Sequence, residues 1–202
     1  LDPEQLHAPF EQALREGHLV PVCFVSARSG AGVRELLDIL GKLAPDPTEG
    51  NPPAFLKGEG AAAEAVELAL DPERHVVAHV FQIANDPYRG KLGMFRVHQG
   101  QVTPNSLLYV GDGRKPFKVA HLLRMQGKNT VESTLAVPGD LCAVARVDEV
   151  CRDAVLHDSH DEDYYHLAPA AWPQPVFGLA LMTRKPADEQ KLSEALARLT
   201  EE

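Results

Sequence analysis

Hydrophobic positions near the start of the chain repeat with the period of a helix. Apolar residues recur every three or four positions over 2–16 and again over 33–43, which predicts two amphipathic helices. Between them, the continuous apolar run "LVPVCFV" at 19–25 predicts a buried strand of a parallel sheet. A strand followed by a loop and a helix is typical of an α/β domain.

From His75 to about Leu156 the pattern changes to short apolar runs separated by turn signals. The runs are "HVVAHVFQIA", "KLGMFRVHQG", "SLLYVGDG", "FKVAHLLRM" and "DLCAVARVDEV", and the turns between them include "NDP", "VTPNS" and "VPGD". Short strands at this spacing predict a small antiparallel barrel that is closed or nearly closed.

Proline-rich or polar stretches on either side of this region predict linkers. Within the first linker, "AAAEAVELAL" at 61–70 favours a helix by propensity, but its alternation also permits a strand. After the second linker, 176–184 predicts a strand and 188–199 a helix, which together are too little to bury a core. The predicted order is an α/β part at 1–46, a linker at 47–74, a barrel at 75–158, a linker at 159–174 and the start of a third domain at 175–202. Because the chain begins at Leu1 within a helical pattern, we expect a piece of a longer protein.

The stretch "DPYRGKLGMFRVHQG" at 86–100 combines glycines and cations within one predicted strand. Glycine inside a strand marks a bulge, a bend or the close approach of another part of the chain. In a regular strand Arg89 and Lys91 share one face and Arg96 lies on the other. We therefore expect Arg89 and Lys91 to be exposed near the turn. Arg96 is expected to face outward only if a bulge, at Gly90 or Gly93, resets the alternation.

Charge is distributed unevenly along the chain. The net charge is −9, which argues against a general nucleic-acid binder. Residues 86–130, however, hold eight cations and two anions, a net +6, whereas the remainder holds 12 cations and 27 anions, a net −15. Two interpretations remain open from the residues alone: a surface that faces RNA, or an ordinary solvated barrel surface.

Several kinds of chemistry have no residues to support them. The chain contains no Gly-x-x-x-x-Gly-Lys-Ser/Thr and no Asn-Lys-x-Asp, so nothing in it predicts a phosphate cradle or phosphoryl transfer. No catalytic residue is expected, and the histidine- and aspartate-rich segment at 157–166 is interpreted as a solvated acidic linker rather than a metal site. The three cysteines are far apart, there is no secretory signal, and no apolar stretch reaches 18 residues. These features favour a cytoplasmic protein without a membrane partner.

Four segments, in this order, resemble elongation factor G and its paralogues, the multidomain translational GTPases. "ALREGHLVPVCFVSARSGAGVRELLDIL" is similar to the last strand and helix of their GTPase domain. "FQIANDPYRGKLGMFRVHQGQVTPNSLLYV" and "VPGDLCAVARV" are similar to strands of their second domain, and "PQPVFGLALMTRKPADEQKLSEALARL" is similar to the start of their third. The resemblance implies a mainly β fold with α/β flanks. An antiparallel translation-factor β-barrel would follow the tail of a P-loop GTPase domain and precede the first β–α unit of a ferredoxin-like domain.

The resemblance also implies a function and its residues. The longer protein would hydrolyse GTP with magnesium and act in translocation on the ribosome, with the barrel serving ribosome docking and interdomain relay; this chain alone would bind neither cofactor. Ser26 and Ala27 match the loop that contacts guanine. The barrel cations become candidates for contact with ribosomal RNA: Arg89, Lys91, Arg96, Arg114, Lys115 and Lys118. We expect a monomer that does not bind DNA. The alternatives are a ribosomal protection protein, a release-factor GTPase or a free-standing β-barrel interaction module.

Overall fold

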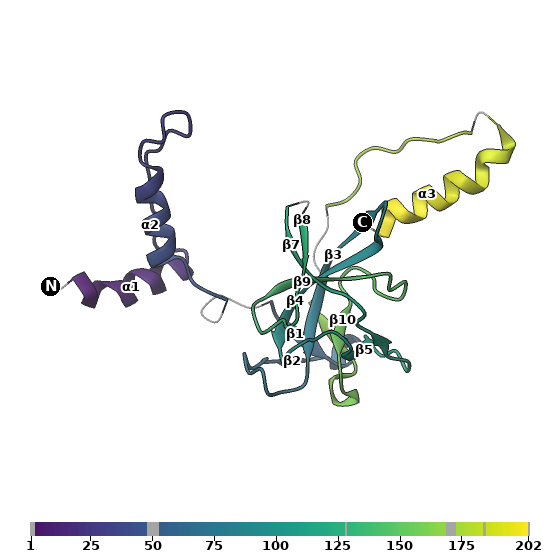
Figure 1. Cartoon of the computed structure of the whole chain (residues 1–202), viewed down its shortest axis with the longest axis horizontal. Helices are drawn as coiled ribbons and strands as arrows, with labels where there is room; N and C mark the ends of the chain where they lie inside the picture. The colour runs from purple at the N-terminus through teal and green to yellow at the C-terminus, as the bar shows by residue number, and fades with distance from the viewer. Residues whose placement is uncertain (1–2, 48–52, 128, 169–172, 184, 202) are drawn as a thin grey trace. The chain divides into compact units, whose positions relative to one another are not determined.

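The computed structural model describes residues 3–47, 53–127, 129–168, 173–183 and 185–201. The chain divides into two compact units, Leu1–Pro52 and Pro53–Glu202, each of which is treated by itself (Figure 1). Among the described residues, no helix has both the length and the apolar character needed to cross a membrane.

The first unit contains two helices, α1 (Pro3–Arg15) and α2 (Val33–Leu43). Both helices confirm the periodicity of the sequence, and α2 has the predicted bounds. The strand predicted at 19–25 is wrong, because this segment has no regular secondary structure. Phe24 is 93% exposed, and no neighbouring strand pairs with the segment within the described part of this unit. An apolar run forms a strand only where a partner supplies the ladder of hydrogen bonds.

The centre of the second unit is a curled antiparallel sheet of eight strands in the order β6-β5-β10-β3-β4-β9-β7-β8. The strands are β3 (Val77–Asp86), β4 (Gly90–Gln99), β5 (Leu107–Val110), β6 (Phe117–Lys118), β7 (Leu122–Gln126), β8 (Asn129–Glu132), β9 (Leu141–Ala145) and β10 (Val155–His157). The mainly β fold predicted from the spacing of short apolar runs is confirmed. The two longest strands, β3 and β4, form a hairpin at the middle of the order.

One apolar cluster fills the inside of this sheet. Its members come from nearly every strand, and Phe95 and Val97 of β4 are fully buried in it. Phe117 of β6 packs against the same cluster that contains Leu122 of β7. Because these two strands are first and seventh in the sheet order, the sheet curls until its two ends share a core.

A second, smaller sheet has the order β11-β1-β2 and packs on the outside of the first. Its strands are β1 (Phe55–Lys57), β2 (Glu64–Val66) and β11 (Tyr165–Leu167), and β1 pairs antiparallel with both others. Phe55 packs against Val77 of β3 and Val155 of β10 in a core of its own. The linker predictions for 47–74 and 159–174 are therefore wrong where these strands form. The open choice at 61–70 resolves to a short 3-10 turn, Gly60–Ala62, followed by strand β2.

In the described residues of the C-terminal part of the second unit, one α-helix is present. A 3-10 turn at Pro186–Asp188 leads into α3 (Glu189–Glu201), which confirms the helix predicted at 188–199. The strand predicted at 176–184 is wrong: residues 176–183 have no regular structure, and Val176 is 98% exposed. As at 19–25, no strand lies beside this segment among the described residues. Residue 184 lies outside the described residues.

Candidate nucleic-acid interface

The turn between β3 and β4 is fixed by the carboxylate of Asp86. Its Oδ1 accepts hydrogen bonds from the backbone N–H of Arg89 at 2.7 Å and of Tyr88 at 2.8 Å. These two bonds favour the ionised carboxylate and lower the pKa of Asp86. Gly90 closes the turn with a φ of +75°, a conformation that glycine adopts without strain. Arg89 is thereby held beside the turn, half-buried rather than fully exposed.

Lys91 lies on the inward-facing row of β4. Pairing along β4 is continuous from Leu92 to Arg96 against β9, so alternation places Lys91 in the row that contains Phe95. Its side chain is only 12% exposed, and its Nζ lies 3.0 Å from the Asp148 carbonyl and 3.1 Å from a carboxylate oxygen of Glu201. The prediction that Lys91 is exposed is wrong, because its ammonium group is already enclosed by these partners.

Arg96 lies on the opposite, outward row of β4 without any bulge at the glycines. The irregularities of the hairpin fall between Val80 and Gln82 and between Val77 and Ala78, so the expectation that Arg96 faces outward only through a bulge at Gly90 or Gly93 is wrong. Gly93 has another reason to be glycine: a Cβ there would lie 2.6 Å from a methyl group of Val150. The outward position of Arg96 follows from plain alternation along the strand.

On the outer face of β4, Arg96 and His98 each have a buried nitrogen without a hydrogen-bond partner. Nε of Arg96 and Nε2 of the neighbouring His98 are both buried without a hydrogen-bond partner. Burial, and then the positive charges of His79 and Arg96, lower the pKa of His98 to about 4. Arg96 is thus a partly buried cation beside a neutral histidine, and only part of its guanidinium is available to a phosphate.

The remaining candidates form a second group, on the connection from β5 to β6. Arg114, Lys115 and Lys118 are all exposed. Val110, just before them, pairs with Leu156, which in turn pairs with Ala78 near the start of β3. Arg89 follows the other end of β3, a strand of ten residues and so about 30 Å long. The six candidates therefore do not form one continuous patch: Arg89 and Lys91 lie at the turn end of the hairpin, and the second group lies on the β5–β6 connection. Arg96 belongs to neither group, because it pairs with His79 near the start of β3.

Ser26 and Ala27 lie in the first unit, in a loop closed by its own hydrogen bonds. The Ser26 backbone N–H donates to the Ala31 carbonyl at 2.9 Å, and the Ser26 carbonyl accepts from Gly30 N–H at 2.8 Å. The Ser26 hydroxyl oxygen accepts from the backbone N–H of Ser29 at 3.3 Å. The loop before α2 is therefore ordered internally, and the Ser26 backbone is engaged in holding it. Contact with guanine by these two residues stays a prediction.

The histidine- and aspartate-rich segment is structured rather than an open linker. Residues His160–Glu162 form a 3-10 turn, and His157 is completely buried, with both ring nitrogens facing backbone carbonyls. Among the described residues, no three His, Cys, Asp or Glu side chains are grouped as metal ligands would be. The interpretation as a solvated linker is wrong for His157 and Glu162, because both side chains are buried.

Comparison with known proteins matches residues 75–153 to the family described as Elongation factor G domain 2. This part of the chain is similar to that family. The match begins just before β3 and ends just before β10, so it covers the other seven strands of the curled sheet and all six candidate cations.

Proteins named elongation factor G align with the whole chain, including the parts outside residues 75–153. Elongation factor G of Ureaplasma parvum serovar 3 is 28% identical over the whole chain, and elongation factor G 2 of Syntrophomonas wolfei is also 28% identical over the whole chain. The chain spans 29% and 28% of the length of these two relatives. A crystal structure from Thermus thermophilus matches the whole chain with a TM-score of 0.73 and 28% identity, and the chain covers 27% of it.

Two histidines of the curled sheet, His79 and His98, were not predicted as part of this surface. His79 pairs with Arg96 across the β3–β4 hairpin, and His98 lies two positions after Arg96 on β4. The surroundings lower the pKa of both histidines. Burial lowers the pKa of His79, although its hydrogen bond to Asp153 opposes the effect. The one available signal was the placement of both histidines next to predicted core positions of the two strands. That signal does not say which face of the strand a side chain occupies.

Proposed function

We propose that this chain serves as the barrel-containing segment of an elongation factor G-like translational GTPase that acts in ribosomal translocation. The observation that carries the proposal is the match of residues 75–153 to elongation factor G domain 2, within relatives that align over the whole chain. In such a protein the barrel docks on the ribosome and relays movement between the GTPase domain and later domains. The longer protein is cytoplasmic and hydrolyses GTP with magnesium.

The exposed group Arg114, Lys115 and Lys118 is proposed as the principal RNA contact. Phosphates attract cations without sequence readout, and exposure leaves all three side chains free to approach a backbone. Arg89 and Arg96 are secondary contacts, because both are half-buried. Lys91 is the weakest candidate, since its ammonium group already has a carbonyl and a carboxylate as partners.

Charge reversal tests this docking role directly. Replacing Arg114, Lys115 and Lys118 by glutamate should weaken binding of the full chain to ribosomes at least tenfold at low salt. The plot of log affinity against log salt should become shallower by about two, because about three phosphate contacts are lost. Ribosome affinity is measured by co-sedimentation over a series of salt concentrations.

A matched control changes the net charge by the same amount outside the barrel. Lys185, Lys191 and Arg198 are exposed cations beside or within α3, and their reversal to glutamate should weaken ribosome binding much less. If both triple variants lose the same affinity, the effect is one of net charge, and the docking role of the β5–β6 connection is rejected.

A further inference from the structure

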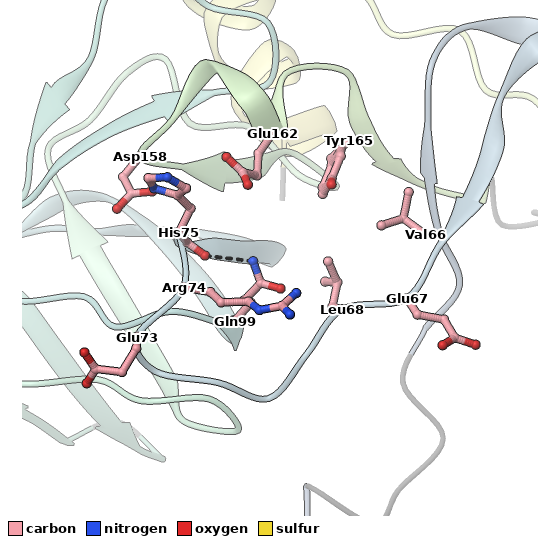
Figure 2. A pocket seen from close by; sticks show the side chains of 10 residues that line it. All are labelled: Val66, Glu67, Leu68, Glu73, Arg74, His75, Gln99, Asp158, Glu162 and Tyr165. Atoms are coloured by element: carbon pink, nitrogen blue, oxygen red, sulfur yellow. Dashed lines mark hydrogen bonds and ion pairs between the residues drawn. The ribbon is translucent and has the colours of Figure 1, made fainter.

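A polar pocket of about 370 Å³ lies in the second unit, on the side of the barrel that carries the small sheet. Figure 2 shows its walls: β2 and the segment after it on one side, and the end of β4 and residues 158–165 on the others. Val66, Leu68 and Tyr165 form the apolar part of the wall. The pocket is separate from both groups of candidate cations described above.

The walls of this pocket are held in place by hydrogen bonds within the chain. Gln99 accepts a hydrogen bond from the Ala69 N–H at 3.2 Å and donates one to the His75 carbonyl at 3.0 Å (Figure 2). Asp158 accepts from the Val76 N–H at 2.9 Å, and its carboxylate lies 3.2 Å from Nδ1 of His75. Two of the polar side chains that line the pocket are therefore committed to positioning the loop that forms it.

Glu162 differs from Gln99 and Asp158 in having a buried oxygen without a hydrogen-bond partner. Its side chain is 9% exposed, and its Oε2 is buried without a hydrogen-bond partner. Figure 2 shows its carboxylate directed into the space between His75 and Tyr165. Burying a carboxylate without a partner is strongly unfavourable, so an unpaired oxygen directed into a cavity indicates a missing cation or donor.

The charges around the pocket favour a cation. Four carboxylates line it, those of Glu67, Glu73, Asp158 and Glu162, against a single arginine. That arginine, Arg74, is 59% exposed and pairs at 3.9 Å with Asp71 instead. Burial, and then the negative charges of Glu162 and Asp161, raise the pKa of Tyr165. The phenol of Tyr165 therefore remains protonated and contributes no charge to the pocket.

Lys57 of the small sheet does not pair with Glu162, because its ammonium group has another partner. Nζ of Lys57 donates to the Asp161 carbonyl at 2.6 Å and lies 5.2 Å from the centre of the Tyr165 ring. A metal ion fits poorly, because no three potential ligands are grouped among the described residues. The apolar walls instead suit the carbon stem of an organic cation.

We propose that this pocket binds a guanidinium or primary ammonium group carried on an apolar stem, with Glu162 as its anionic partner. The stem lies against Val66 and Leu68, and the cationic group replaces the partner that Oε2 of Glu162 lacks. Such a group occurs on small free amines and on the arginine or lysine side chains of a polypeptide. The proposal is independent of ribosome docking, because no candidate RNA-contact residue lines the pocket.

Nuclear magnetic resonance titration of the isotope-labelled full chain tests the proposal. Agmatine, a free guanidinium on a four-carbon stem, should shift the backbone amide signals of Ala69 and Val76 in a saturable manner. Glu162→Gln keeps the shape of the side chain but removes its charge, and it should weaken agmatine binding at least tenfold. The control Glu73→Gln neutralises an exposed carboxylate of the same pocket and should weaken binding less than threefold.

Two further probes separate the sources of the cation. The blocked peptide acetyl-Gly-Arg-Gly-amide should bind as well as agmatine if the natural ligand is a polypeptide side chain, and more weakly if it is a free amine. Magnesium chloride alone should leave the Ala69 and Val76 signals unchanged, and shifts that depend on Glu162 would show a metal site and overturn the proposal.

A measurement of thermal stability shows whether Glu162→Gln fails to bind agmatine only because it is misfolded. Without ligand, Glu162→Gln should raise the melting temperature of the chain, because a neutral amide costs less to bury without a partner than a carboxylate does. Absence of saturable agmatine shifts, equal affinity in Glu162→Gln, or a lower melting temperature of that variant would each overturn the proposal.

Discussion

Acid should destabilise the barrel through one buried imidazole, that of His98. His98 is 6% exposed on the outer face of β4, and its ring meets the edge of Phe55 at 4.9 Å between ring centres. The titratable and charged groups that act on it are His79 on β3 and Arg96 on β4, both of which oppose its protonation. The informative change is His98→Phe, which retains a ring against Phe55 but cannot take a proton.

The expected size of the effect follows from the pKa values of the folded and unfolded states. In the fold the pKa of His98 is about 4, below its ordinary value of 6.5. Above pH 6.5 the imidazole is neutral in both states and its contribution is fully present. As the pH falls from 6.5 towards 4, His98 becomes protonated in the unfolded chain but stays neutral in the folded chain. The folded state is therefore destabilised relative to the unfolded state. A tenfold change in proton affinity corresponds to about 1.4 kcal/mol, so the loss approaches about 3 kcal/mol near pH 4.

Urea unfolding followed by far-ultraviolet circular dichroism, at pH 7, 5.5 and 4, measures this loss. The wild-type chain should lose about 3 kcal/mol more than His98→Phe over this range, because other titrating groups are common to both proteins. His98→Gln, which is polar but does not titrate, separates the loss of charge from the change of ring. If the free energy of unfolding has the same pH dependence in the wild type and in both variants, the pKa of His98 is not lowered by the fold, and the reasoning is wrong.

Two other predictions follow from single contacts. Gly93→Ala should destabilise the barrel by about 1–3 kcal/mol in urea unfolding, because its Cβ would lie 2.6 Å from a Val150 methyl group; an unchanged midpoint would contradict this close packing. Calorimetric titration with GTP or GDP should show no binding up to about 1 mM, because the guanine contact predicted for Ser26 and Ala27 would be one edge of a pocket, and the sequence has no phosphate-binding motif. Micromolar affinity would contradict the proposed role of this chain as a segment without the nucleotide site.

The sequence predicted those elements whose formation depends on local pattern. Helix α2 begins and ends where its apolar stripe does, and the barrel strands follow the runs between turn signals. The runs at 19–25 and 176–184 failed because a strand needs a pairing partner, which a local pattern does not contain. The three-residue strands β1 and β11 were missed for a related reason: they are too short to show alternation, and they pair with each other across more than 100 residues of chain.

The sequence showed which cations belong to the candidate site, but it did not show which of them are exposed. The excess of cations over 86–130 is visible in the sequence, and Arg114, Lys115 and Lys118 are exposed as a surface contact requires. The burial of Lys91 depends on which row of β4 faces inward and on the turn that carries Asp148. That turn lies 57 positions away in the sequence, so nothing near Lys91 indicates its enclosure.

The most direct test of the central claim is competition for the ribosome. Labelled full chain is bound to ribosomes at low salt, and unlabelled full-length elongation factor G is added with a non-hydrolysable GTP analogue. If the barrel occupies the position of elongation factor G domain 2, the factor should displace the chain completely, and the Arg114, Lys115 and Lys118 reversal should show little binding to displace. Simultaneous binding of both proteins, or no binding of the chain at any salt concentration, would contradict the account.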